Sequence, residues 1–99
     1  MTKVAVRTKD KIHTLALLGK TGHWHGLNLE RVRNCTEVRI YNWEGNIRLV
    51  AAIIPQECYS ITDKGQTRIV IGFDPKTVCI EAVDPPRKFS QRSAFYEDN

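Results

Sequence analysis

The residue types best suited to chemistry gather in the last third of the chain. A strand-like run over residues 78–83 stops at Asp84-Pro85-Pro86, and the next ten residues read RKFSQRSAFY. This segment carries Arg87, Arg92 and Tyr96 beside a lysine and two serines. Cations and hydroxyl groups that leave the end of a buried strand could line a groove that handles phosphate, because guanidinium groups pair well with phosphate oxygens.

Arg48 is a second candidate for phosphate chemistry. It stands next to the longest apolar run of the chain, residues 49–54, and its face of a strand continues with apolar side chains. The side chain lies either at the edge of a sheet, where it reaches water, or in a concave site where its planar guanidinium group binds phosphate. The acidic residues are dispersed, and no Ser-His-Asp or Cys-His arrangement follows from the spacing. Any catalysis would therefore use arginine, lysine, histidine and tyrosine.

The tripeptide His23-Trp24-His25 stands between glycines at positions 22 and 26. A zinc-type site would need at least a third ligand, which only His13 or a distant side chain could supply, so we predict no metal site. One reading is a polar and aromatic loop without a function. The other is that Trp24, near Lys20, stacks against a nucleic-acid base while its neighbours contact phosphate groups.

Positive charge is concentrated in the first third. Residues 1–33 hold seven Lys and Arg against two acids, whereas the whole chain has a net charge of +4. Such a segment favours an anionic partner, most commonly nucleic acid, although a solvated basic face has the same composition. The residues expected to contact nucleic acid from this region are Lys9, Lys11, Lys20, His23, Trp24 and His25.

Several function classes receive no support. Gly19-Lys20-Thr21 resembles the end of a phosphate-binding loop, but the glycine that the loop needs at position 14 is Thr14, so we expect no nucleotide cofactor, nor any other. The longest apolar run, six residues, is too short for a membrane span, and no secretion signal is visible. Three scattered cysteines form neither a disulfide framework nor a zinc motif, which favours reduced thiols and a cytoplasmic location.

The 99 residues predict one domain, in which residues 85–99 could be a flexible tail. Alternation predicts a short strand over residues 3–7, and apolar spacing predicts a helix that begins near a Thr8 cap and ends at Gly19. Residues 27–32 could form a second helix. Turn residues then separate strands at 37–41, 47–54, 67–73 and 78–83. The sequence therefore predicts an α+β fold, an antiparallel meander with one or two short helices on one face and residues 49–54 as a central, fully covered strand.

Part of this pattern resembles the RelE-like family, the ribosome-dependent mRNA endonucleases of bacterial toxin–antitoxin systems. Residues 35–40 (CTEVRI) and 46–50 (NIRLV) are similar to that family's second and third strands, and residues 87–96 are similar to its basic C-terminal segment with a catalytic tyrosine. The resemblance covers roughly residues 35–96, with gaps. It departs where the helical region is short, where residues 56–66 have no counterpart, and where a family lysine falls on Glu37, beside Arg39.

The resemblance implies a metal-independent endoribonuclease. Arg48 would stabilise the phosphate charge, Arg87 or Arg92 would act on the leaving side, Tyr96 would assist proton transfer, and Arg39 would join the basic cluster. RNA or the ribosome would be the partner, together with an antitoxin or a host target protein. The alternative is a bacterial or phage binding module that performs no chemistry and docks nucleic acid or protein. The catalytic reading requires Arg48, Tyr96 and one of the two other arginines to share a cleft.

Overall fold

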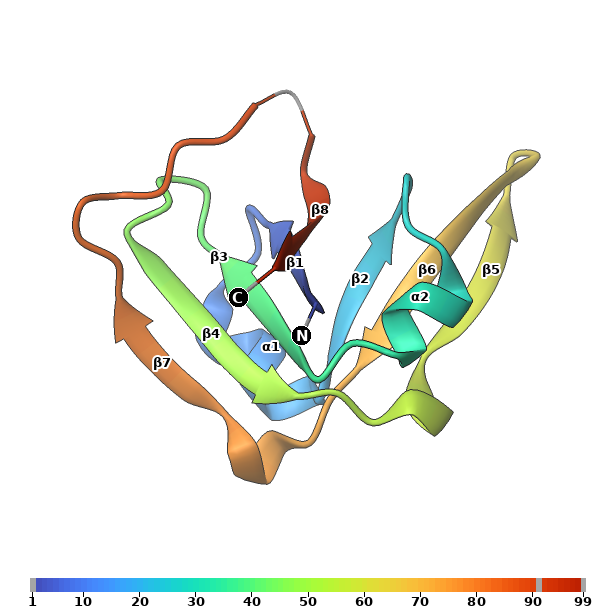
Figure 1. Ribbon diagram of the computed structural model, residues 1–99, viewed down its shortest axis with the longest axis horizontal. Coiled ribbons are helices and arrows are strands. Elements are labelled where there is room, and N and C mark those ends of the chain that lie inside the picture. The colour runs from blue at the N-terminus through green and yellow to red at the C-terminus, as the bar shows by residue number, and fades with distance from the viewer. Residues whose placement is uncertain (1, 91, 99) are drawn as a thin grey trace.

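The computed structural model describes residues 2–90 and 92–98, which form eight strands in two sheets with two short α-helices (Figure 1). The five-stranded sheet has the order β7-β4-β3-β1-β8 and comprises β1 (Thr2–Arg7), β3 (Glu37–Tyr41), β4 (Ile47–Ala52), β7 (Cys79–Ala82) and β8 (Ala94–Asp98). The three-stranded sheet has the order β2-β6-β5 and comprises β2 (Lys20–Trp24), β5 (Tyr59–Asp63) and β6 (Gln66–Gly72). The α-helices are α1 (Ile12–Leu18) and α2 (Leu29–Arg33), and two 3₁₀ turns are η1 (Pro55–Glu57) and η2 (Pro75–Thr77).

The chain crosses between the sheets four times. It leaves the larger sheet after β1, forms α1, β2 and α2, and returns to lay β3 parallel to β1. All other strand pairs are antiparallel. An isolated bridge between Ile53 and Phe73 joins the two sheets. The expected α+β class, with mostly antiparallel strands and two short helices, is confirmed, but residues 66–72 pair in the smaller sheet instead of continuing one meander.

The core fills the space between the two sheets and the helices. The larger sheet contributes one face of its strands, including Val4, Val38 and Leu49, and the smaller sheet contributes Ile69 and Ile71. Burial of these aliphatic side chains is the main stabilising term of such a domain. Of the predicted central strand 49–54, residues 49–52 do lie between two other strands, in β4, but β4 alternates between buried and more exposed side chains because only one of its faces packs into the core. The most continuously buried strand is the end of β6 instead.

Three local expectations differ from the structure. Helix α1 ends at Gly19 as predicted, and the φ of 70° there suits glycine. The helix begins only after Lys11, however, so Thr8 does not cap it. Thr8 Oγ1 instead accepts a hydrogen bond from the Asp10 amide. The His23-Trp24 region is the end of strand β2 and not a loop. Residues 94–98, expected to lie in a tail, form β8, which pairs with β1 along its length.

Candidate functional site

Three of the predicted phosphate-binding arginines lie on the outer face of the larger sheet, where each already has a carboxylate partner. Arg39 lies 3.0 Å from Glu37 and 2.9 Å from Glu97, Arg48 lies 2.6 Å from Glu81, and Arg87 lies 2.8 Å from Glu97. Burial lowers the pKa of Arg39, but its hydrogen bonds and charge interactions with the two glutamates outweigh this, so the pKa is raised. These cations are neutralised by the protein itself.

Arg48 is held in the same way. Burial lowers its pKa, but hydrogen bonds to Tyr41 and Glu81 raise it overall, and Nη1 donates to the Tyr41 hydroxyl at 3.2 Å. Register explains the pairing, since Arg48 stands opposite both Tyr41 on β3 and Glu81 on β7. The sequence leaves two alternatives for Arg48, a concave phosphate-binding site and a water-exposed sheet edge. The structure shows neither of them. The side chain bridges two strands as part of an ion network.

The segment between β7 and β8 covers this network. Phe89 packs edge-on against Tyr41 with ring centroids 5.4 Å apart, and Arg87 lies over the ring of Phe95 at 4.7 Å. The Arg87 amide donates to the Gly45 carbonyl at 2.9 Å. A Cβ at Gly45, whose φ is +77°, would clash with the Arg87 carbonyl oxygen, so only glycine allows this close approach.

Tyr96 lies on the opposite face of the sheet from Arg48. It stands opposite Val4 in the β1–β8 register and packs against the core. Its hydroxyl accepts a hydrogen bond from the Asn28 amide at 3.0 Å, and Arg31 lies 3.7 Å from its ring centroid. Because alternate residues of a strand point to opposite faces, Arg48 and Tyr96 do not share a cleft. The predicted convergence of these residues is therefore wrong.

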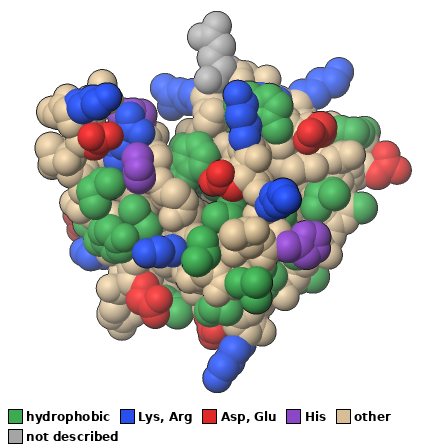
Figure 2. Space-filling view, turned by 180° about the vertical axis from the view of Figure 1, so that it is seen from behind, with side chains coloured by type: hydrophobic (Ala, Val, Ile, Leu, Met, Phe, Trp, Pro, Cys, Tyr) green, Lys and Arg blue, Asp and Glu red, His purple; other side chains and the backbone are tan. Residues whose placement is uncertain are grey.

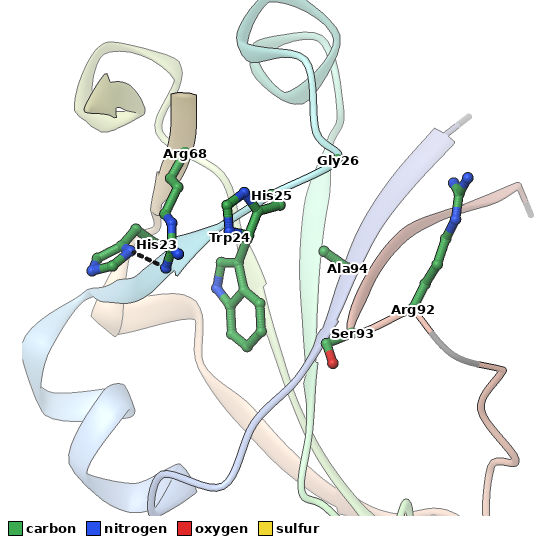
Figure 3. A pocket seen from close by; sticks show the side chains of 8 residues that line it. All are labelled: His23, Trp24, His25, Gly26, Arg68, Arg92, Ser93 and Ala94. Carbon is green, nitrogen blue, oxygen red and sulfur yellow. Dashed lines mark hydrogen bonds between the residues drawn. The ribbon is translucent and has the colours of Figure 1, made fainter. Parts of the chain in front are cut away.

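A different group of the predicted residues does come together. An open pocket of about 570 Å³ lies where β2, the edge strand of the smaller sheet, approaches the start of β8, the edge strand of the larger one. His23, Trp24, His25 and Gly26 line one wall with Arg68 of β6, and Arg92, Ser93 and Ala94 line the other (Figure 3). Two segments more than sixty residues apart thus build one pocket.

The backbone fixes both walls. Trp24 stands opposite Ile69 and His23 opposite Val70, so the two side chains leave β2 on opposite faces. Gly26 has a φ of +75° where the chain turns away after the strand. On the other wall, the Ser93 carbonyl accepts a hydrogen bond from the Arg7 amide at 2.7 Å, which ties the beginning of β8 to β1.

The pocket is rich in hydrogen-bond donors and has no carboxylate among its lining residues. The indole of Trp24 lies between β2 and the segment that carries Ser93, just before β8 (Figure 3). Trp24 Nε1 and Arg68 Nε are buried without a hydrogen-bond partner. Arg92 extends away from the indole on the far wall (Figure 3). From behind, histidine side chains lie beside Lys and Arg side chains on the lobe that carries the β5–β6 hairpin, with an acidic side chain among them outside the pocket lining (Figure 2). Such a surface suits an anionic ligand with a planar group.

The lysines of the first third lie elsewhere. Lys9 and Lys11 line a second pocket of about 520 Å³, together with Trp43 and two acids, Asp10 and Glu44. The ring of Trp43 already has cationic neighbours: the guanidinium carbon of Arg7 is 3.8 Å from its centroid and Lys9 Nζ is 4.6 Å away. Lys20 is exposed at the start of β2 and does not line either pocket. Of the predicted nucleic-acid contacts, residues 23–25 therefore line one pocket and Lys9 and Lys11 the other, whereas Lys20 and Arg39 line neither.

Sequence reasoning missed Arg68 and Ser93. Arg68 looks like one more solvated charge on a strand, and only the pairing of β6 with β2 brings it to His23. Ser93 was visible as part of the basic C-terminal segment, but its place opposite Trp24 depends on β8 joining β1. In the part of the chain that the structure describes, no three His, Cys, Asp or Glu side chains gather closely enough to hold a metal ion.

Comparison with known proteins does not identify a relative. No protein-family model matches the chain, and neither the curated proteins nor the solved structures contain a match. Within the described residues, no helix is long and apolar enough to cross a membrane.

Proposed function

We propose that the protein is a non-catalytic nucleic-acid-binding module that holds single-stranded RNA in the pocket between β2 and β8. The observation that carries the proposal is a single pocket that is lined by Trp24, Arg68, Arg92 and two histidines and by no carboxylate. Base stacking on an aromatic ring, combined with cations along the backbone path, is how proteins bind single strands without reading a fixed sequence.

Trp24 suits stacking better than Trp43. Among the described residues, none contacts the Trp24 ring as a cation or aromatic partner, and the ring lies in the pocket wall. Trp43 is 38% exposed, but its ring already contacts the cations of Arg7 and Lys9, and its acidic neighbours would repel a phosphate backbone.

Cleavage of the RelE type is not part of the proposal. It needs unpaired cations and a tyrosine around one phosphate, whereas Arg48 and Arg87 are engaged by Glu81 and Glu97, and Tyr96 bonds Asn28 on the other face. Binding without chemistry requires only the pocket. The protein would act in a reducing compartment, most simply the cytoplasm, because Cys58 and Cys79 are free thiols.

The stacking role is tested by fluorescence anisotropy with a labelled oligouridylate of about ten nucleotides, within the site sizes of single-strand binders. Trp24→Leu keeps apolar packing but cannot stack, and it should weaken binding by about five- to 150-fold, the equivalent of 1–3 kcal/mol. Trp43→Leu is the matched control and should change the Kd by less than about threefold. Equal losses in both variants, or undetectable binding by the wild type at low salt, would refute the proposal.

The charge contribution has its own test. Each cation that contacts a single-strand phosphate adds about 0.7 to the steepness of log K against log salt. Arg68→Gln combined with Arg92→Gln should therefore flatten the slope by about 1.4. Lys9→Gln combined with Lys11→Gln removes the same charge from the other pocket and should leave the slope nearly unchanged. If the lysine substitutions flatten the salt slope more than the arginine substitutions do, the nucleic acid binds at the Trp43 pocket instead. An acidic peptide that competes with the oligonucleotide would indicate a protein partner instead.

A further inference from the structure

Helix α1 carries an apolar projection on its exposed side. Leu17 is 86% exposed and Leu18 is 59% exposed, although the opposite side of the same helix already packs Ile12 and Leu15 into the core. A single exposed leucine is ordinary, but adjoining ones that continue into further apolar surface mark an interaction site. We call Leu17 and Leu18 the knob. It lies at the C-terminal end of α1.

A hollow with apolar side chains in its wall lies at the other end of the same helix. It is the second pocket, of about 520 Å³, which Trp43 and Ile47 line together with Ile12. Thr14 also lines it, and Leu17 is the neighbour of Thr14 on the helix surface because it follows three residues later. The knob and the hollow are therefore only about one helical turn apart, about 5 Å along the axis. In the view from behind, apolar side chains are exposed on this side of the molecule (Figure 2).

Unpaired charges of opposite sign stand at the two ends of this face. Lys20 follows the helix at the knob end, and Lys76 lies in η2, against the same end. Asp10 and Glu44 line the hollow, with two further lysines that reduce its net charge. Among the described residues none of these four forms an ion pair, and the Asp74 carboxylate accepts a hydrogen bond from the Lys76 amide. Because carboxylates line the hollow, an anionic membrane or an acidic peptide fits it poorly.

We propose that this face pairs with the same face of a second copy, so that the protein forms a two-fold symmetric dimer through α1. A two-fold axis brings one surface against itself, and such a surface must carry both a projection and the hollow that receives it. With the two helices antiparallel, the knob of each copy enters the hollow of the other, beside Trp43. Lys20 of each copy then approaches Asp10 of the other, which sets the orientation more than the affinity.

The dimer is independent of the RNA pocket. Trp24 lies at the far end of β2 from α1, so both pockets stay open when two copies pair through α1 (Figure 1). Failure of RNA binding therefore leaves the dimer standing, and failure of the dimer leaves the proposed function standing.

Sedimentation equilibrium of the full chain measures the association, between about 1 µM and about 1 mM, where weak interfaces dissociate. The wild type should pass from monomer to dimer in this range and stop at two chains, because a two-fold interface is closed. Leu17→Gln should weaken the dimer about a hundredfold or more, since each dimer loses two buried leucines. Its urea unfolding should stay unchanged, because the position is exposed and glutamine suits a helix. Tyr59→Gln, at another exposed side chain, is the matched control and should change the Kd by less than about threefold.

An exchange of charges tests the antiparallel orientation. Lys20→Glu combined with Lys76→Glu should weaken self-association, and so should Asp10→Lys combined with Glu44→Lys. A mixture of these two variants should pair again, because each end then meets an opposite charge. A mixture that stays monomeric would overturn the antiparallel arrangement.

Three other results would overturn the dimer itself. One is a wild type that is monomeric at about 1 mM, and another is a dimer that Leu17→Gln does not weaken. The third is binding to phosphatidylserine vesicles that is lost in Leu17→Gln, since this would assign the face to a membrane surface.

Discussion

Glu97 should be the most important carboxylate for the stability of the domain. Its side chain, only 14% exposed, pairs with Arg39 at 2.9 Å and with Arg87 at 2.8 Å, and the Tyr41 hydroxyl lies 3.3 Å from Oε1. The Glu97→Gln substitution keeps the shape of the side chain and removes its charge. Arg39 would then lose a charged acceptor and Arg87 its ion-pair partner, on a face that the chain between β7 and β8 covers.

The cost follows from these contacts. A hydrogen bond between charged groups contributes about 1.5–3 kcal/mol. Arg39 Nη1 donates such a bond to Glu97 Oε1, whereas Arg87 Nε forms only an ion pair with Oε2, without hydrogen-bond geometry. Arg39 keeps Glu37 as a partner at 3.0 Å, and the Arg87 side chain is 35% exposed, so solvent reduces both terms. We expect a loss of about 2–3 kcal/mol in the free energy of unfolding, equivalent to about 10–20 °C in Tm.

Urea unfolding measures the difference, and Glu81→Gln is the matched control. Glu81 also pairs with an arginine, Arg48, but the two side chains are 40% and 27% exposed, so the control should cost less than about 1 kcal/mol. Equal costs for the two substitutions, or a neutral Glu97→Gln, would show that the network contributes no more than ordinary surface pairs.

Two further outcomes test the packing. Gly45→Ala should destabilise the protein by more than about 2 kcal/mol in urea unfolding, because the cost of positive φ adds to a clash with the Arg87 carbonyl. Gly26 has a similar φ but nothing within 4 Å of its added Cβ, so Gly26→Ala should cost only about 1 kcal/mol. Burial raises the pKa of the Cys58 thiol, so a thiol reagent near pH 8 should modify exposed Cys79 and reach Cys58 only on unfolding. Because the folded pKa is the higher one, this contribution to stability is complete below the unfolded thiol's value, about 8.5, and is lost as the pH rises through the folded value. Rapid labelling of both cysteines would contradict the expected burial.

The parts of the fold that the sequence predicts are those encoded locally. Alternation identifies residues 37–41, and the spacing of Ile12 and Leu15 before a glycine identifies α1. Strand β2 is not visible in this way, since Lys20–Trp24 has one buried residue, Thr21, and owes its conformation to pairing with β6. Strand β8 is hidden by the proline and basic residues before it, although Ala94 and Tyr96 both face the core.

The candidate site is only partly predictable, because residue types can be read from the sequence but long-range strand pairing cannot. His23, Trp24, His25 and Arg92 can be selected from the sequence by residue type, and all four line one pocket. The cleft expected around Arg48 fails because its partner, Glu81, is thirty-three residues away and becomes a neighbour only through the β4–β7 pairing. Long-range strand order decides whether an arginine is free to bind a ligand, and periodicity carries no information about it.

The central claim is that a base stacks on Trp24. The Trp43→Phe protein retains Trp24 as its only tryptophan, so its emission reports on the pocket directly. Titration with single-stranded oligouridylate should quench this emission along the same curve as the anisotropy of the labelled strand, since stacking brings the base against the indole. Binding by anisotropy with unchanged Trp24 emission would place the nucleic acid elsewhere on the protein and contradict the account.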